Sequence, residues 1–197
     1  MSDSKPDRIL AEKSDNPWVK LILWSNEHPE RPATRWNGFM KYLVEERRAR
    51  LESLNLTDEQ RIFLMQDWDV VSGQLKRASP LSGDELEHSK NLFPIDTNFS
   101  QHLPNITIDN LIFSKELSFA GAFFARMISF KNCCFERPVN FYGASFNFTA
   151  TFSGSTFSKE VNFGDAQFCV PALFNRVMFC REVNFYCQPT DNTFHAH

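Results

Sequence analysis

The segment KEVNF at residues 159–163 returns almost unchanged as REVNF at residues 181–185. The same spacing of 22 residues leads backwards to RPVNF at 137–141 and to KELSF at 115–119. Self-similarity at a fixed period is the sequence signature of a repeat architecture, in which each unit stacks on its neighbours. The pattern therefore predicts that the chain returns to the same structural position once in every repeat.

Phenylalanine marks a shorter period inside this repeat. Of the 21 Phe residues, 17 lie after residue 100, and 14 of these stand alternately six and five residues apart, at positions 113, 119, 124, 130, 135, 141, 146, 152, 157, 163, 168, 174, 179 and 185. Ile108 extends the series backwards, and a smaller or apolar side chain stands two residues before each centre. Alternate residues of an extended segment point to the same side, so each pair faces one interior. This pattern predicts a β-solenoid.

One coil is expected to contain a full repeat rather than half of one. At ~3.3 Å per residue, a half repeat of about 11 residues gives a perimeter of at most ~36 Å, which leaves little room for opposed sheets ~10 Å apart. The segments midway between the repeats, RMISF at 126–130 and FTATF at 148–152, also differ from the KEVNF pattern. We therefore expect four sides with one centre each, in which Phe119, Phe141, Phe163 and Phe185 stack along one side. Phe123, beside the centre Phe124, is expected to lie outside the core.

The segment 106–187 resembles the pentapeptide-repeat family, in its phenylalanine-rich branch with alternating spacing. The resemblance is carried by the central Phe residues and by the smaller residue two positions before each. It implies a right-handed, four-sided β-helix with the centres stacked inside. The sixth residue of each longer unit is expected to form a bulge or a wider corner. The fold class is thus α+β, with this β-solenoid preceded by a small α-helical domain.

The first hundred residues contain four helix signals. Asn16-Pro17 is a helix start, residues 35–53 have one apolar face, and Thr57 with Gln60 and Ser82 with Glu85 match capping boxes. The apolar face of the third helix includes Trp68 and Val71. The sequence thus predicts a disordered tail (1–15), a helical domain (16–94), a connector (95–105), the solenoid (106–187) and an irregular tail (188–197). That last segment is either a cap or the link to further coils, and the helical domain is expected to cover the first coil.

The residues that carry chemistry in other proteins do not form a recognisable motif here. The five cysteines have irregular spacings that fit neither a zinc site nor a disulfide framework, and Cys133 is an inward position. His195 and His197 are interpreted as an exposed polar end. Glycine-rich phosphate loops and the sequence motifs of hydrolases are missing. We expect no enzymatic activity, no cofactor and no metal.

One outward position of the repeat is basic in every coil. Lys115, Arg137, Lys159 and Arg181 should form a column along one edge, and Glu116, Glu160 and Glu182 follow three of them. This column is either a recognition edge for an acidic partner or a charge-balanced, solvated corner. Asn140, Asn162 and Asn184 form a second column, which would make an amide ladder if it points outward.

The sequence therefore predicts a protein-interaction or scaffold module, bacterial and cytoplasmic, whose partner is another protein. A second copy of the chain, bound through the solenoid end, is a further candidate partner. One alternative is the soluble part of a larger membrane or signalling protein. Another follows from the resemblance, since some members of the family mimic DNA and bind topoisomerases, but they are long acidic rods. The net charge of −3 and the lack of an apolar run near ~20 residues indicate neither nucleic-acid binding nor membrane insertion.

Overall fold

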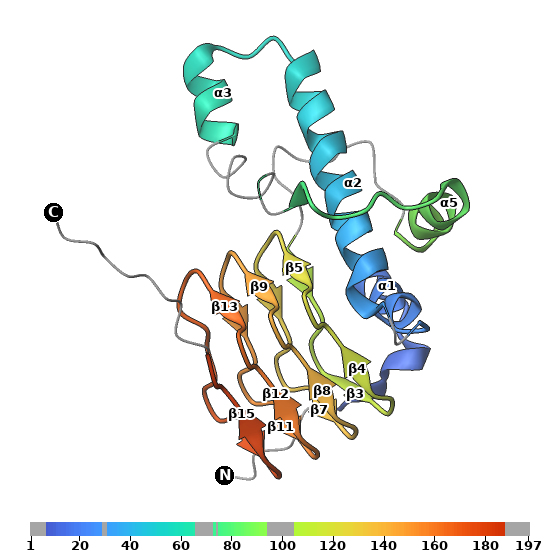
Figure 1. Ribbon diagram of the computed structural model, residues 1–197, viewed down its shortest axis with the longest axis vertical. Coiled ribbons are helices and arrows are strands. Elements are labelled where there is room, and N and C mark those ends of the chain that lie inside the picture. Colours follow the sequence, from blue (N-terminus) through green and yellow to red (C-terminus); the bar gives the residue numbers. More distant parts are fainter. Residues whose placement is uncertain (1–6, 29–30, 66–72, 74, 94–104, 188–197) are drawn as a thin grey trace, which may run out of the picture.

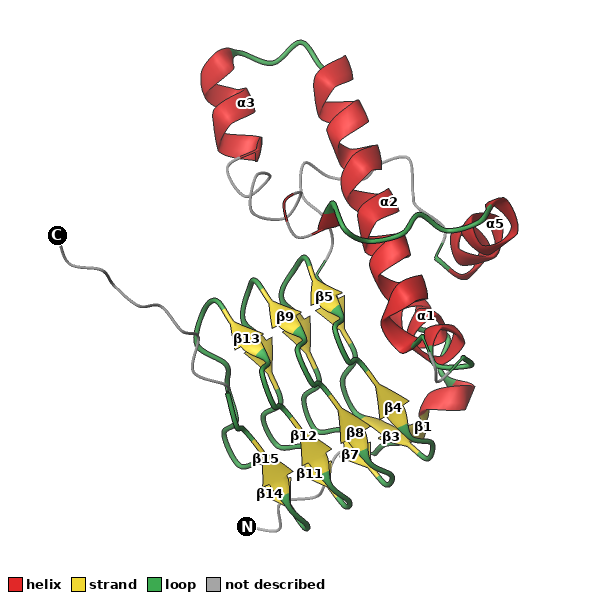
Figure 2. Ribbon diagram, viewed as in Figure 1, coloured by secondary structure: helices red, strands yellow, loops and turns green. Residues whose placement is uncertain are grey.

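A group of helices lies across one end of a stack of short parallel strands (Figures 1 and 2). This computed structural model describes residues 7–28, 31–65, 73, 75–93 and 105–187. The helices are η1 (Ala11–Lys13), α1 (Pro17–Ser25), α2 (Pro32–Ser53), α3 (Asp58–Met65) and α5 (Gly83–Leu92). The strands that follow form a β-solenoid. The predicted α+β fold, a β-solenoid preceded by a small helical region, is confirmed.

The expected helix starts are present in the structure. The Asn16 side chain accepts a hydrogen bond from the Trp18 N–H at the start of α1. Ser82 and Glu85 form a reciprocal capping box at the start of α5. Trp68 and Val71, expected on the third helix, lie outside the described residues. In the described part of the chain, no helix combines the length and the apolar character that a membrane crossing requires.

The solenoid has four sides, each a short parallel sheet, which we number in chain order. Side 1 contains β2 (Ile106–Thr107), β6 (Ile128–Ser129) and β10 (Ala150–Thr151). Side 2 contains β3 (Leu111–Phe113), β7 (Cys134–Phe135), β11 (Thr156–Phe157) and β14 (Met178–Phe179). Side 3 contains β4 (Leu117–Ser118), β8 (Val139–Asn140), β12 (Val161–Asn162) and β15 (Val183–Asn184), and side 4 contains β5 (Phe123–Phe124), β9 (Ser145–Phe146) and β13 (Gln167–Phe168).

Each coil contains one full repeat, as predicted. Val161, for example, pairs with Val139 below it and Val183 above it. The rings of Phe119, Phe141, Phe163 and Phe185 stack along side 3, with neighbouring centroids 4.9–5.0 Å apart and planes within 6° of parallel. Corresponding Phe columns fill the other three sides. The chain repeats itself because each repeat places a new ring on the one below.

Two kinds of corner explain the alternation of five and six residues. The five-residue steps contain tight turns, such as the one closed by the Ala122 N–H and the Phe119 carbonyl at 2.9 Å. Each has one residue with positive φ, at positions 110, 121, 132, 143, 154, 165 and 176. This conformation is disfavoured for side chains with a Cβ, and Gly or Asn takes five of the seven positions. The six-residue steps contain no residue of positive φ in the described chain, so they form the other two corners without this constraint.

The expectation of a disordered tail over residues 1–15 is wrong for residues 9–13. Ile9 and Leu10 form β1, which pairs in parallel with β3 through Leu111 and Ile112. η1 follows at once, and the Glu12 carboxylate accepts a hydrogen bond from the Ser114 hydroxyl at 2.8 Å. The physical reason is the edge of side 2 at the first coil, which offers unpaired backbone groups that a short extended segment can satisfy.

Three asparagine side chains from the helical part bond to the first strands of the other three sides. On side 1, Asn16 Nδ2 donates to the Thr107 carbonyl at 2.7 Å. On side 3, Asn26 Oδ1 accepts from the Ser118 N–H at 2.6 Å. On side 4, Asn37 bonds both Phe123 and Gly121. Together with β1, these side chains give every side of the first coil a hydrogen-bonding partner.

The helical part and the solenoid share one apolar core. Trp36 of α2 lies 5.4 Å from Phe124 between ring centroids, and its indole N–H donates to the buried Phe123 carbonyl at 2.9 Å. Trp18 packs on both Trp36 and Phe93. The first coil is thus covered by the helices, as the sequence predicts.

Candidate functional site

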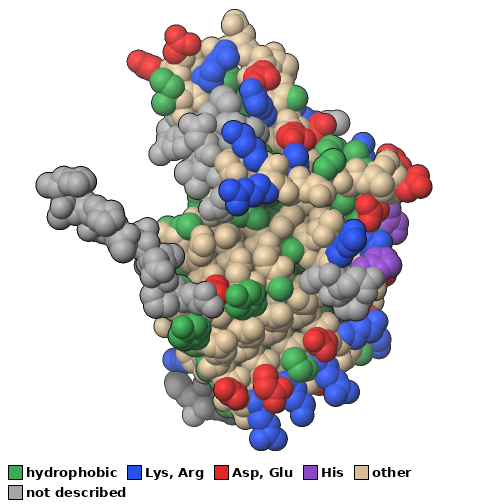
Figure 3. All heavy atoms as spheres, viewed as in Figure 1, with side chains coloured by type: hydrophobic (Ala, Val, Ile, Leu, Met, Phe, Trp, Pro, Cys, Tyr) green, Lys and Arg blue, Asp and Glu red, His purple; other side chains and the backbone are tan. Residues whose placement is uncertain are grey.

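The basic column expected at one edge of the solenoid is present. Lys115, Arg137, Lys159 and Arg181 lie one above another at the corner between sides 2 and 3, where the strands on either side are paired in register. Lys159 is half-buried, and the other three are exposed. Figure 3 shows basic and acidic side chains interspersed along this lower edge of the molecule.

Acidic residues accompany each member of the column. Glu116, Glu160 and Glu182 follow three of the four basic residues, and Glu136 precedes Arg137. Glu12 of η1 belongs to the same edge. The hydrogen bond from Ser114 lowers the pKa of the Glu12 carboxyl, and the charge of Lys115 lowers it by a smaller amount. The edge carries both signs of charge at similar density. This favours the interpretation as a solvated, charge-balanced corner.

The asparagine side chains of the column on side 3 form hydrogen bonds within the corner that follows each of them. The side-chain oxygens of Asn140, Asn162 and Asn184 each accept the N–H two residues further on, at 2.8–2.9 Å. Asn184 also donates to Asn162 at 3.0 Å, which is one step of the expected amide ladder. These amides stabilise the stack and the tight turns, and their polar groups are largely occupied.

The Cys133 thiol, at the inward position, is unreactive. Cys133 is buried, its Sγ donates to the Ile108 carbonyl at 2.9 Å, and burial raises its pKa to about 12. A thiol of this kind stays protonated at neutral pH and is a poor nucleophile. The described residues contain no group of three His, Cys, Asp or Glu side chains suited to a metal ion. His195 and His197 lie outside them.

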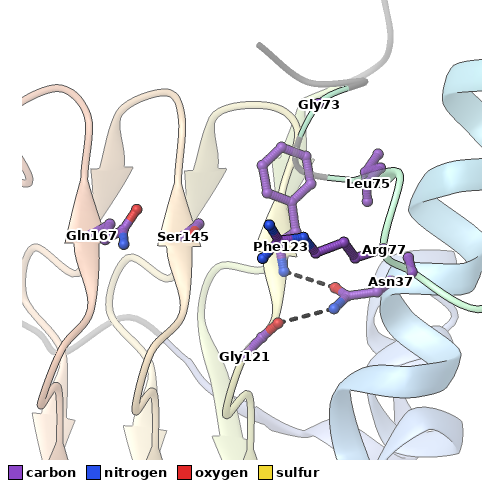
Figure 4. Close-up of a pocket in the computed structure, with 9 residues that line it drawn as sticks. Asn37, Gly73, Leu75, Arg77, Gly121, Phe123, Ser145 and Gln167 are labelled. Atoms are coloured by element: carbon purple, nitrogen blue, oxygen red, sulfur yellow. Dashed lines mark hydrogen bonds between the residues drawn. The ribbon is translucent and has the colours of Figure 1, made fainter.

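The structure contains a cleft that the sequence did not reveal. A hollow of about 480 Å³ lies between side 4 of the solenoid and the segment that precedes α5 (Figure 4). Its lining comes from both parts of the molecule: Asn37, Gly73, Leu75, Arg77, Ala78, Gly121, Phe123, Ser145 and Gln167.

The floor of the cleft is the outer surface of side 4. Phe123, Ser145 and Gln167 occupy corresponding positions on β5, β9 and β13 and are paired in register. Phe123 was expected to lie outside the core, and it does point away from the Phe column, but it is only 5% exposed. The helical part covers this end of side 4 and buries the ring, so the expectation that Phe123 lies outside the core is wrong.

Helix α2 contacts both the floor and the wall of the cleft. Asn37 accepts from the Phe123 N–H at 2.8 Å and donates to the Gly121 carbonyl at 2.9 Å (Figure 4). Lys41 Nζ donates to the Ala78 carbonyl at 3.1 Å. A Cβ at Gly38 would stand 2.9 Å from the Leu81 side chain and 3.1 Å from the Ser79 carbonyl, so glycine at this position favours the close approach of this segment to α2. The floor and the wall are therefore connected through α2.

A network around Arg35 fixes the helices behind the wall. Its guanidinium donates to Glu85 of α5 at 3.1 Å and to the Trp24 carbonyl of α1 at 3.0 Å, and it lies 4.5 Å from the Trp24 ring. Hydrogen bonds from the Ser82 backbone and, second, from Arg35 lower the pKa of the Glu85 carboxyl. One side chain thus connects three helices.

Arg77 gives the cleft its charge. It is the one charged side chain among the described lining residues, and it has no hydrogen bond or ion pair to another described residue. Figure 4 shows its side chain extending from the wall across β5, and Figure 3 shows Lys and Arg side chains gathered on the helical part above the solenoid. The cleft combines a cation with the polar groups of Ser145 and Gln167, while Leu75 and Phe123 beside them are almost fully buried.

Only part of this cleft has a signal in the sequence. The outward positions 123, 145 and 167 follow from the repeat, but so do the outward positions of the other sides. No local pattern indicates that residues 73 and 75–78 lie opposite them, since that contact depends on how the helices pack.

Comparisons of this chain with protein-family models, with curated proteins and with solved structures found no significant match.

Proposed function

We propose that this chain is a non-enzymatic protein-interaction module of the pentapeptide-repeat type, and that a segment of a partner protein binds in the cleft. The family assignment is supported by the inward centres, by the smaller residue two positions before each, and by the four-sided coil that holds one full repeat. On that assignment the β-helix is right-handed.

The cleft is the observation that carries the proposal. Its floor is a sheet whose strands are fixed by stacked Phe rings, such as Phe124, Phe146 and Phe168 at 4.7 Å between neighbours. Helix α2 is hydrogen-bonded to that floor through Asn37 and to the wall through Lys41 and the Ala78 carbonyl. Binding to a surface that is already ordered costs little conformational entropy, so modest contacts can give a useful affinity. The lining offers hydrogen bonds and one charge, which suits recognition.

The basic column remains a competing surface for the same kind of partner. Three of its four cations are exposed, but their acidic neighbours reduce the net attraction for an acidic protein. The cleft, in contrast, has shape as well as charge. Surfaces that are concave and contain a few placed polar groups are the more frequent binding sites.

A capture experiment with matched variants tests the proposal. The full chain, carrying an affinity tag, is compared with Gln167→Tyr, which fills the cleft floor, and with Met178→Tyr, which places the same ring on the exposed outer surface of side 2. Quantitative mass spectrometry should show at least one protein that wild type and Met178→Tyr retain and Gln167→Tyr loses. Identical protein sets for all three chains would contradict a partner site in the cleft.

A second copy of the chain is a further proposed partner, through the last coil. Besides Met178, which lies on the outer surface of side 2, four exposed large apolar side chains belong to this coil: Val170, Leu173, Phe185 and Tyr186. Light scattering should show a dimer that Phe185→Asp converts to a monomer and that Leu54→Asp, at an exposed residue of the helical part, leaves intact. A monomer at every concentration of the wild-type protein would contradict this pairing.

A further inference from the structure

We infer that the segment bound in the cleft is extended and acidic, with a carboxylate paired to Arg77. This inference rests on the proposed function and adds the chemical class of the partner. It is carried by two features of the cleft: the guanidinium that no described residue pairs and the spacing of the polar floor.

The guanidinium of Arg77 differs from those that the structure uses internally. Arg35 is paired with Glu85 and stacked on Trp24, and Arg126 lies 5.1 Å from the Phe148 ring. Arg77 has no such partner among the described residues, although it lines a concave surface. A planar guanidinium presents a fork of N–H groups that matches a carboxylate in two parallel hydrogen bonds. The charge of the site therefore calls for an acidic group in the ligand.

The floor of the cleft fits an extended chain. Ser145 and Gln167 lie on adjacent paired strands, so their side chains are separated by about one strand spacing of ~4.8 Å. A hydroxyl and a carboxamide can each donate and accept hydrogen bonds, which are the two functions that a peptide backbone requires. A segment that crosses the strands from Ser145 to Gln167 can therefore form hydrogen bonds with both side chains.

An acidic protein segment fits better than a nucleic acid. A phosphate backbone needs several cations in a row, because its affinity comes from neutralising many phosphates. The described lining contains a single cation, and the chain as a whole carries a formal charge of −3. One carboxylate, placed among hydrogen-bonding contacts, matches this composition.

The test uses the full chain labelled with ¹⁵N and two end-blocked dodecapeptides, one of repeating Gly-Glu-Leu-Ser and one with Gln in place of Glu. The Glu peptide should shift the amide signals of Phe123, Ser145 and Gln167 and the Nε signal of Arg77. Arg77→Gln should weaken its binding about tenfold, as should the Gln peptide on the wild-type chain, because each change removes one partner of a charge-assisted hydrogen bond. The control Arg137→Gln removes the same charge from the basic column and should leave the affinity unchanged.

Each other outcome overturns the inference in a distinguishable way. Equal binding of both peptides in the cleft would exclude the carboxylate contact and leave the proposed function standing. Shifts at Lys115 and Arg137 instead of the cleft, or no binding by either peptide, would contradict an acidic ligand here. The comparison of Gln167→Tyr with Met178→Tyr then decides separately whether the cleft binds a partner at all. A single-stranded oligonucleotide that displaces the Glu peptide and binds more tightly would assign the cleft to nucleic acid.

Discussion

The two ends of the solenoid are built from the same repeat and differ in what covers them. Phe119 in the first coil and Phe185 in the last belong to one column, and each stacks on its neighbour at 5.0 Å between centroids. Phe119 is 2% exposed, whereas Phe185 is 51% exposed. A stacked ring is thus buried only if something lies on its other face. At the first coil the helical part supplies that cover.

The backbone shows the same contrast. The first strands of the four sides bond to β1, Asn16, Asn26 and Asn37. In the last coil, the N–H groups of Val183 and Phe185 correspond to those of Val161 and Phe163, which donate to the coil that follows. The described part of the chain contains no further coil that could accept hydrogen bonds from these N–H groups. An open sheet edge is a site for pairing with another chain, so we expect the helical part to protect the first coil from such pairing.

Removing the helical part should have the largest effect. A fragment of residues 101–197 leaves every edge of the first coil open and exposes the ring of Phe124 that Trp36 covers. We expect this fragment to aggregate under conditions in which the full chain does not, because open edges and apolar surface both favour association. The measurement is light scattering together with circular dichroism.

Adding residues 1–100 as a separate chain should reduce the aggregation of the fragment. A monomeric fragment with the full β-sheet signal would show that the stacked rings alone hold the first coil, and the protective role would have to be abandoned.

A cavity in the middle of the stack should cost more than one at its open end. Phe152 is fully buried and lies between Phe130 and Phe174. Phe152→Ala should lower the free energy of unfolding by about 3–5 kcal/mol, because neighbouring coils cannot collapse into the space. Phe185→Ala removes a half-exposed ring and should cost well under half of that. Denaturant titrations measure both, and equal losses would mean that the last coil is covered in solution.

The asparagine bonds to the first coil should each contribute measurably. Asn37→Ala leaves the Phe123 N–H and the Gly121 carbonyl without their partners, beneath a helix. We expect a loss of about 1 kcal/mol, the usual net contribution of a hydrogen bond, because the bond to the Phe123 N–H is only partly buried and Gly121 is exposed. Asn175→Ala, at an exposed position of the last coil, is the matched control and should change little. Similar losses for both variants would show that Asn37 contributes no more than an ordinary surface amide.

The sequence predicts contacts between copies of the repeat, but it does not predict contacts between segments that are far apart in the chain. The stacking of Phe119 on Phe141 follows from the spacing of the repeat, because a repeat brings its own copies together. Asn16 was recognised as a helix cap, yet its second bond to Thr107 was not, since that contact spans 91 positions. β1 has only two residues and no strand signal of its own. The position of Arg77 opposite Ser145 likewise depends on helix packing, which no local pattern encodes.

The smallest effect is expected from the ion pair behind the cleft wall, and it depends on pH. The pKa of the Glu85 carboxyl is lowered in the folded protein, first by the Ser82 backbone and then by Arg35. The stability that this carboxylate contributes is therefore present above the pKa of the unfolded chain. It is lost as the pH falls through the pKa of the folded protein. The Glu85 side chain is 37% exposed, so solvent screening keeps this contribution below about 1 kcal/mol. Glu85→Gln should therefore be slightly less stable than wild type at pH 7, and the stabilities of the two proteins should become equal in acid, where the carboxylate is protonated.

Glu87→Gln is the control, because the Glu87 carboxylate is 70% exposed and 3.9 Å from Lys90, and it should show a smaller loss of stability at neutral pH. A difference between Glu85→Gln and wild type that persists at low pH would point to lost packing around Ser82 and exclude the charge as its cause.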